Sequence, residues 1–341
     1  MRPAPAFWWR KDPSAAAVAL WPLAKLFGLG AAWRMGLPPR FRPPVPVICV
    51  GNFVVGGAGK TPLAIAIARI ARGRGLRPGF LASGYGGSRI EPTLVDPAAH
   101  RAAEVGDEAL LLAAAGPTVV ARDRAAGARR LLQEGPDLLV MDDGFQNPAL
   151  AKDVSLVAVD AGAGLGNGQL FPAGPLRAPL LLQLRRADAL VVIGDGEAAE
   201  PLIRAAARAG RATLRARLKP VRVKEWRKEP ILAFAGIGRP EKFFATLAEI
   251  RAPVAKTVAF ADHHTFSDAE ADRLIAHADA AGLRLVTTEK DMARLHGEGG
   301  ALGRLRDRAE AFPVILEFEN PAAIGEMIGD AVRNRAAARS A

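Results

Sequence analysis

The sequence predicts a layered α/β protein with two α/β domains, preceded by an apolar N-terminal segment. Short apolar runs alternate with longer segments of helical period, which is the pattern that strands and helices give in layered sheets. A strand–loop–helix unit stands at residues 44–69, and the same order restarts at Ile231. Between these units, residues 213–226 alternate like a β-ribbon. A chain of 341 residues is long enough for about two domains.

Residues 44–69, PVPVICVGNFVVGGAGKTPLAIAIAR, form a glycine-rich turn between an apolar run and a helical segment. Glycines without a Cβ let backbone N–H groups close around a phosphate, while a lysine adds charge and a threonine hydroxyl suits Mg²⁺. We interpret this stretch as a P-loop, although Val54 stands where the usual spacing has glycine. The alternative is an ordinary flexible turn. The predicted nucleotide-binding residues are Asn52, Val54, Val55, Gly56, Gly57, Ala58, Gly59, Lys60 and Thr61, together with Lys290 later in the chain.

Composition limits the classes of partner. The formal net charge of +11 is compatible with nucleic acid, an anionic membrane surface or an acidic substrate, and by itself does not choose among them. Nucleic acid is not expected as a partner, because Tyr85 is the only tyrosine and no RNA-binding aromatic signature is present. Cys49 is the only cysteine, which excludes an intrachain disulfide and fits a reducing cytoplasm.

The N-terminal segment from Ala15 to Trp33 is apolar for about the length of a membrane span. Pro22 and Lys25 interrupt it, so it reads as a poor spanning helix. Four tryptophans with basic neighbours suit an amphipathic helix lying in the headgroup plane of a membrane. The alternative is a helix packed on its own domain.

Two pairs of acidic residues are candidates for catalysis or metal binding. Asp107 and Glu108 open a leucine-rich helical run, where acids are commonly helix caps or partners of the helix dipole. Asp142 and Asp143 follow the apolar run LLVM, as does the Mg²⁺-holding acid of P-loop enzymes. A plain Asp-Gly turn is the alternative for the second pair.

Three further features lie after predicted strands. Residues 161–179 are rich in glycine and proline and form a candidate substrate loop, in which Arg177 could hold an anionic group. His263 and His264 follow a strand, but no third ligand at suitable spacing supports zinc. A histidine that assists a carboxylate is therefore favoured over a metal site, and solvated turn residues are the alternative. Lys290 lies at the ligand-binding edge of the second sheet, within a possible capping box of Thr288 and Asp291.

These features divide the chain into four parts. We predict an N-terminal helix and connector at 1–43, a P-loop core at 44–212, a β-ribbon linker at 213–229 and a C-terminal α/β domain at 230–341.

The ordered motifs closely resemble one family. They are VGNFVVGGAGKTP, GYGG, VGDEALLLA, DDGFQNP, GNGQLFPAGPLR, AFAGIGRPEKFF, ADHHTF and TTEKD. Together, from about residue 8 to residue 295, they resemble the tetraacyldisaccharide 4′-kinases of lipid A biosynthesis. The resemblance implies two α/β/α domains joined by a short β-ribbon, with the active site between them. It also implies ATP as phosphate donor, a lipid A disaccharide 1-phosphate as acceptor, and a monomer on the cytoplasmic face of the bacterial inner membrane.

The resemblance also implies roles for individual residues. Lys60 and Thr61 would bind ATP phosphates and Mg²⁺, and Asp142 and Asp143 would serve the metal. Asp107 would take the proton of the 4′-hydroxyl, paired with His263. The remaining implied roles are metal or phosphate positioning by Glu108 and charge neutralisation by Arg177.

The chain departs from the family pattern at three positions. Ser83 stands where arginine is common before G-Y-G, Ala178 where glutamate is common, and Asn147 where histidine is frequent. Two other functions remain open: a P-loop kinase of a soluble sugar or nucleotide, and a nucleotide-switched partner protein. Val55 occupies the place of the first lysine in the K-G-G-x-G-K switch motif, which counts against the second.

Overall fold

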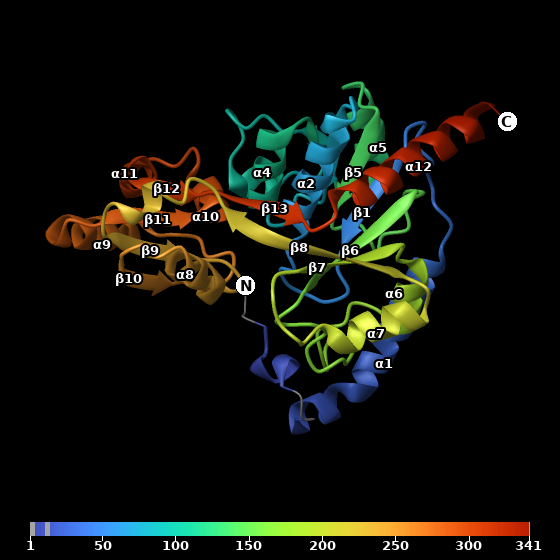
Figure 1. The fold of residues 1–341 in the computed structure, drawn as a ribbon, viewed down its shortest axis with the longest axis horizontal. Coiled ribbons are helices and arrows are strands. Elements are labelled where there is room, and N and C mark those ends of the chain that lie inside the picture. The colour runs from blue at the N-terminus through green and yellow to red at the C-terminus, as the bar shows by residue number, and fades with distance from the viewer. Residues whose placement is uncertain (1–3, 11–13, 341) are drawn as a thin grey trace.

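The computed structural model describes residues 4–10 and 14–340, and its strands form a sheet of nine strands and a sheet of four. Each sheet is the centre of one domain, and the two domains lie side by side (Figure 1). The larger sheet contains β1 (Val47–Gly51), β2 (Pro78–Ala82), β3 (Thr93–Leu94), β4 (Thr118–Val120), β5 (Leu138–Asp142), β6 (Val154–Asp160), β7 (Ala189–Ile193), β8 (Ala212–Pro220) and β13 (Val314–Phe318).

The strand order of the larger sheet is β13-β8-β7-β6-β1-β5-β2-β4-β3. Neighbouring strands from β8 to β4 run parallel, and only the edge strands β13 and β3 are antiparallel. β1 is central, with Ile48 paired to Val140 of β5 and to Val154 of β6. Because parallel strands end at the same edge, the segments that follow β1, β2 and β5 meet there.

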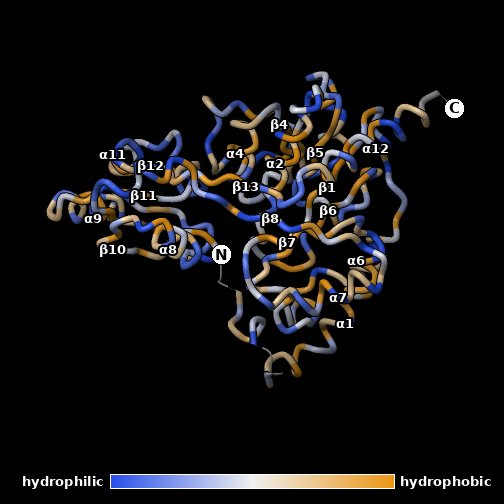
Figure 2. The backbone as a smooth tube through the Cα atoms, in the orientation of Figure 1, coloured by the Kyte–Doolittle hydropathy of each residue, from blue (hydrophilic) through white to orange (hydrophobic). Residues whose placement is uncertain are grey.

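Helices cover both faces of this sheet. They are α1 (Ala15–Gly36), α2 (Lys60–Gly73), α3 (Ala102–Val105), α4 (Asp107–Ala115), α5 (Arg124–Leu132), α6 (Leu180–Arg186), α7 (Glu200–Arg208) and α12 (Pro321–Ser340), with a short 3-10 helix η1 (Ala6–Trp9) before them. Along β1, Ile48 and Val50 pack with α2, α4 and α12, whereas Val47 and Cys49 pack with α5, α6 and α7. Figure 2 shows that hydrophobic residues are concentrated in the middle of this domain.

The second domain has a parallel sheet in the order β10-β9-β11-β12. Its elements are η2 (Glu225–Arg227), β9 (Ile231–Ala235), α8 (Pro240–Glu249), β10 (Val254–Ala259), α9 (Asp268–Ala281), β11 (Arg284–Thr288), α10 (Glu289–Leu295), α11 (Gly300–Arg308) and β12 (Ala309–Phe312). Helices α9, α10 and α11 pack on one face of the sheet, and α8 packs on the other.

The C-terminal segment belongs to the first domain, which corrects the predicted boundary of 230–341. β13 pairs with β8 in antiparallel register, Leu316 opposite Leu218, and so returns the chain to the larger sheet. α12 then packs on α2, and Arg335 forms a buried ion pair with Asp153 just before β6. The predicted ribbon is therefore made of β8 leaving and β13 returning, and β8 itself also pairs with β7.

The N-terminal helix is present, and most of its exposed large side chains are apolar. Val18, Leu26, Leu29 and Trp33 all lie largely in solvent, whereas Ala17, Ala24, Gly28 and Met35 face the domain. Among the described residues, α1 is the one helix long and apolar enough to cross a membrane by length and composition. Residues 1–3 and 11–13 of the predicted segment 1–43 lie outside the described part of the chain.

Candidate active site

The glycine-rich turn leaves β1 and enters α2 at Lys60, as a P-loop does. Gly56 and Gly59 have positive φ angles of 112° and 79°, a conformation that favours glycine. A Cβ at Gly59 would also come within 2.9 Å of the Ile193 side chain. The Lys60 amine lies back over the turn, 3.3 Å from the carbonyl oxygen of Gly56. The turn therefore has a conformation that few other residues would adopt, with its cation already in place.

The remaining predicted residues of the turn contribute mainly their backbone. The buried Asn52 side chain donates to the Gly56 carbonyl oxygen at 2.9 Å, which braces the turn across its mouth. Val55 donates its N–H to the carbonyl oxygen of Pro175 at 2.8 Å, and Val54 forms a bridge with Leu176. Valine is accommodated at position 54 because its backbone pairs with the 161–179 loop. Gly57 and Ala58 complete the turn, and Ala58 is buried.

The loop at 161–179 also brings Arg177 to the turn. Its guanidinium donates from Nε to the Val54 carbonyl oxygen at 2.9 Å and from Nη1 to Asp143 Oδ1 at 2.8 Å. Lys60 lies 3.8 Å from the other oxygen of Asp143. Although burial opposes it, the charges of Lys60 and Arg177 hold the pKa of Asp143 below its usual range. Two cations and one carboxylate therefore surround the turn.

Asp142 ends β5 and points at the start of α2. Its Oδ2 accepts the Thr61 hydroxyl at 2.9 Å, while its buried Oδ1 has no hydrogen-bond partner among the described residues. Burial, with the nearby charges of Glu108 and Asp143, raises the pKa of Asp142 to about 7. A bound cation would stabilise this buried carboxylate, because one of its oxygens has no hydrogen-bond partner and a threonine hydroxyl lies beside it.

The described residues contain no preformed cluster of three or more His, Cys, Asp or Glu side chains that could hold a metal. In ATP-dependent enzymes, Mg²⁺ is usually held by one or two carboxylates together with substrate phosphates and water. The orphaned oxygen of Asp142 and the hydroxyl of Thr61 fit such a site. The donor set consists of hard oxygen ligands, as Mg²⁺ prefers.

Asp107 begins α4, and its carboxylate faces the second domain. Oδ2 accepts from Arg294 Nε at 2.8 Å and lies 3.3 Å from His263 Nδ1, while Oδ1 accepts the Glu108 N–H at 2.8 Å. Although burial opposes it, the hydrogen bond with His263 and the charges of Lys290 and Arg294 hold the pKa of Asp107 well below its usual range. Residues of the second domain thus bind Asp107, so its contacts exceed those of a residue that only caps a helix.

Glu108 is bound in the same way, by Lys290 Nζ at 2.8 Å. Lys290 was predicted at the ligand-binding edge of the second sheet, and it reaches from there to the first domain. Burial alone would lower the pKa of Lys290, but the charges of Glu108 and Asp107 raise it, so the ammonium form of Lys290 is favoured. The site thus contains two ion pairs that join the domains, Asp107 with Arg294 and Glu108 with Lys290.

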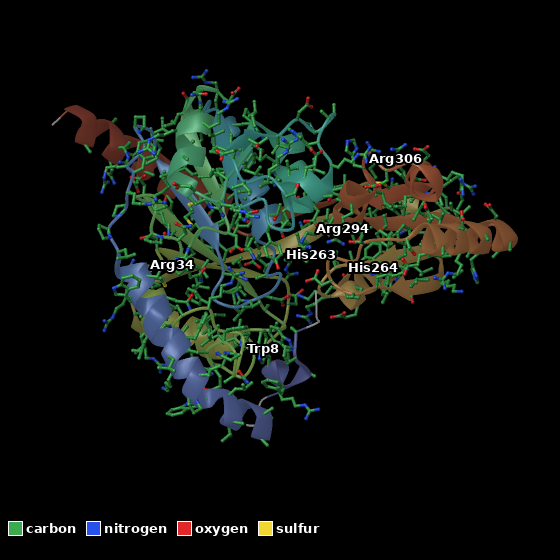
Figure 3. All side chains as sticks on the ribbon, turned by 180° about the vertical axis from the view of Figure 1, so that it is seen from behind. Trp8, Arg34, His263, His264, Arg294 and Arg306 are labelled. Carbon is green, nitrogen blue, oxygen red and sulfur yellow. The ribbon has the colours of Figure 1, made fainter. Side chains whose placement is uncertain are left out.

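The two histidines lie in different surroundings. His263 has a positive φ of 54°, donates its N–H to the Gly236 carbonyl oxygen and places its ring 5.7 Å from that of Tyr85. His264 instead pairs with Glu270 at 3.0 Å and stacks on Phe260. Figure 3 shows His263 and Arg294 where the second domain meets the first. Only His263 joins the site.

Arg294 is the main site residue that the sequence did not indicate. Its Nη1 donates to Asp291 Oδ1 at 2.7 Å and to the carbonyl oxygen of Gly236 at 2.5 Å, while the rest of the guanidinium holds Asp107. Gln146 was also missed; it donates to the Asn52 carbonyl oxygen and to Gln183. The only local signal for Arg294 is its position three residues after Asp291 on α10.

A pocket lies between these groups at the ends of β2 and β5. It is lined by Ala82, Ser83, Gly84, Tyr85, Gly106, Glu108, Ala109, Asp142 and Asp143. Ser83 therefore borders the site, whereas Ala178 is buried and Asn147 accepts the Ala149 N–H in a turn.

Comparisons with known proteins show the family to which this chain belongs. The family model described as LpxK, tetraacyldisaccharide-1-P 4′-kinase, matches residues 16–333. This chain belongs to that family. A curated relative from Rhizobium meliloti (strain 1021), named tetraacyldisaccharide 4′-kinase, is 49% identical over 98% of this chain and 97% of its own length. A relative of the same name from Methylobacterium sp. (strain 4-46) is 54% identical over 86% of this chain and 88% of its own length.

A solved structure shows the same fold. It is described as LpxK from Aquifex aeolicus in complex with ATP, and it covers 93% of this chain and 99% of its own length with a TM-score of 0.71. At 24% identity it supports the fold alone. The predicted α/β fold and the predicted family are both confirmed, and family membership does not favour the soluble-acceptor kinase or the nucleotide-switched partner.

Proposed function

We propose that this chain transfers the γ-phosphoryl group of ATP to the 4′-hydroxyl of a tetraacyldisaccharide 1-phosphate, a lipid A precursor. Family membership supports the reaction, and one structural observation carries it. A single pocket is bordered by Asp142 and Asp143, which lie beside the P-loop, and by Glu108, which the second domain binds. A nucleotide on the P-loop would therefore face the residues at the domain boundary.

The P-loop and its neighbours would align and neutralise the transferred phosphate. Phosphoryl transfer needs mainly positioning and charge stabilisation, which Lys60 and Arg177 supply as cations on one side of the turn. Mg²⁺, when bound with ATP, would neutralise phosphate charge beside Thr61 and Asp142. Glu108 and Asp143 lie close enough to Asp142 to raise its pKa, and we assign them to the same negative pocket. The backbone from Asn52 to Ala58 would enclose the phosphates.

The acceptor hydroxyl must lose a proton, and we assign that proton to Asp107 and His263 together. A carboxylate held as acidic as Asp107 is a poor proton acceptor by itself. Imidazole is the side chain best suited to take up protons near neutral pH, and His263 Nδ1 lies 3.3 Å from the Asp107 carboxylate. In this assignment Asp107 orients the hydroxyl and the imidazole, and the pair shares the proton.

We further propose that α1 attaches the chain to the cytoplasmic face of the inner membrane. Its apolar side chains project outward, and Trp33 is 72% exposed. Tryptophan at this position, with Arg34 beside it, suits the headgroup region of a bilayer. We assign a monomer as the working unit, because both halves of the site come from one chain.

Transfer of radiolabelled γ-phosphate from ATP to a tetraacyldisaccharide 1-phosphate in mixed micelles tests the function. Wild type is compared with Asp107→Asn and with His264→Asn, a matched change at the neighbouring histidine that faces Glu270. We expect transfer to collapse in the first variant, with ATP binding retained, and to persist in the second. Absence of wild-type transfer despite ATP binding would reject the lipid acceptor in favour of a soluble one.

A further inference from the structure

Many of the exposed large apolar side chains lie on α1 or beside it. Beside the helix, Leu181 on α6 is 71% exposed and Phe171 on the 161–179 loop is 38% exposed. Isolated exposed apolar residues are ordinary, but a contiguous group marks an interaction surface. α6 and this loop therefore need to be considered together with α1.

α6 has one face in the core and one face in solvent. Gln183 and Leu184 are buried against the sheet. Leu181 and Arg185 are exposed and stand four residues apart, which places them on the same side of the helix. Arg186 is exposed as well. The outward side of α6 thus presents an apolar side chain followed by two guanidinium groups.

This outward side is continuous with α1. Trp21 and Lys25 of α1 line a groove of about 190 Å³ together with Pro179 and Leu180, at the start of α6. The ring of Phe171 lies 5.1 Å from that of Phe27 on α1. Figure 1 shows α1 running along the outside of the domain beside α6. One surface therefore includes α1, the loop tip and the first turn of α6.

The charged residues within α1 and α6 have a single sign. α1 carries Lys25 and Arg34, α6 carries Arg185 and Arg186, and neither helix contains an aspartate or a glutamate. Asp188, just after α6, is exposed and accepts the Ser155 N–H at 2.7 Å. An apolar centre flanked by the basic residues of both helices is complementary to a bilayer with anionic lipids, in which tails meet the apolar part and phosphates meet the guanidinium groups.

We propose that α6 is a second membrane contact, with Leu181 entering the headgroup region and Arg185 and Arg186 binding anionic lipid phosphates. The proposal rests on the membrane attachment assigned to α1 and goes beyond it. A single helix leaves a protein free to rotate about its axis, whereas a second contact fixes which side of the domain faces the bilayer. The acceptor cleft would then keep one orientation relative to its lipid substrate.

Site-specific fluorescence tests this contact. Cys49 is fully buried, and burial raises the pKa of its thiol, so an introduced surface cysteine can be labelled selectively. An environment-sensitive nitrobenzoxadiazole label is placed in the full chain through Leu181→Cys, Leu26→Cys or Lys228→Cys. Position 26 reports on α1, and position 228 is an exposed site in the linker between the domains. Each protein is mixed with vesicles of phosphatidylcholine and phosphatidylglycerol containing headgroup-proximal spin-labelled lipid.

We expect a blue shift and quenching at positions 181 and 26 and neither at 228. A response at 26 without one at 181 would confine the contact to α1 and overturn the proposal. A response at neither position would reject the membrane attachment itself, and kinase activity measured in micelles would then still test the reaction separately.

Charge reversal gives an independent measurement. Each basic residue near an anionic surface contributes about fivefold to binding, so Arg185→Glu with Arg186→Glu should weaken vesicle binding by about 25-fold or more. Lys224→Glu with Lys228→Glu makes the same change in net charge on exposed linker positions and should change binding by less than about twofold. Equal losses in the two double variants would show that net charge alone drives binding and would reject a contact at α6.

Discussion

Replacement of Arg294 by methionine should destabilise the protein strongly, because the arginine is shared by two buried carboxylates. Its side chain is 9% exposed, that of Asp107 5% and that of Asp291 0%. Methionine retains the length and most of the volume of the aliphatic stem but removes every hydrogen bond of the guanidinium. Asp107 and Asp291 would then share one missing cation within the protein interior.

The expected magnitude follows from the burial of the pair. Removal of one partner of a buried ion pair leaves an uncompensated charge and costs about 3–5 kcal/mol, far more than the net contribution of an intact surface pair. For domains of this size we expect a fall in melting temperature of about 10 °C or more. Arg294→Lys keeps the charge but not the forked contacts, so its loss should be intermediate. Differential scanning calorimetry at one pH and ionic strength measures all three proteins.

A matched control is available in the same domain. Arg304 forms an ion pair with Asp272 at 2.7 Å, but the two side chains are 63% and 58% exposed. Arg304→Met should therefore cost less than about 1 kcal/mol. If Arg294→Met melted within about 2 °C of wild type, the buried pair would contribute no more than a surface pair, and the reasoning from burial would be refuted.

Three other substitutions or conditions test the site and its surroundings. Gly59→Ala places a Cβ on a residue with a positive φ and within 2.9 Å of the Ile193 side chain, so it should lower the free energy of unfolding by about 1–2 kcal/mol. Gly73→Ala on α2 is the control, because a Cβ there meets nothing within 4 Å and should not lower the stability. The pKa of Asp142 is raised to about 7, and in the proposed site only its ionised form would bind Mg²⁺. Apparent Mg²⁺ affinity in calorimetric titrations with an ATP analogue should therefore fall about tenfold from about pH 8 to about pH 6, and a flat profile would contradict the assignment of Asp142 as a ligand. Burial alone would raise the pKa of Glu270, but its hydrogen bonds with Ser267 and His264 lower that pKa to about 2. The stability from this carboxylate is therefore present above its unfolded value of about 4.3 and is lost as pH falls toward 2, and Glu270→Gln should flatten the melting temperature over that range.

Elements with strong local signals could be predicted closely from the sequence. The strand–loop–helix order that the sequence predicts to restart at Ile231 begins there with β9, and the spacing from Ser267 to Glu270 is typical of the start of a helix such as α9. β9 is an apolar run bounded by turn residues, and α9 begins with a capping box in which Ser267 and Glu270 satisfy each other's backbone. These signals act within a few residues, so sequence alone contains them.

Assignment of the last strand and helix to a domain could not be predicted in this way. The run from Val314 to Phe318 reads as a strand, but nothing within it indicates which sheet it joins. Its partner is β8, about one hundred residues earlier, and the pairing depends on how the β8 strand emerges beside β7. Its neighbour in the chain, β12, belongs to the other sheet. Proximity in sequence therefore pointed to the wrong domain.

In the candidate site, contacts within one domain could likewise be predicted from the sequence, whereas contacts between the domains could not. The P-loop and the acids after β5 could be placed together in advance, because β1 and β5 are parallel and their carboxyl ends share an edge. Lys290 and His263 could be placed at the corresponding edge of the second sheet, but not opposite particular partners. Those partners follow from the angle at which the domains meet, and that angle depends on β8 and β13 together. Two of the ion pairs that join the domains, Glu108 with Lys290 and Asp107 with Arg294, lie in this site. Site assembly is therefore a consequence of domain approach, because these two carboxylates of the first domain meet their cations only when the second domain is in place.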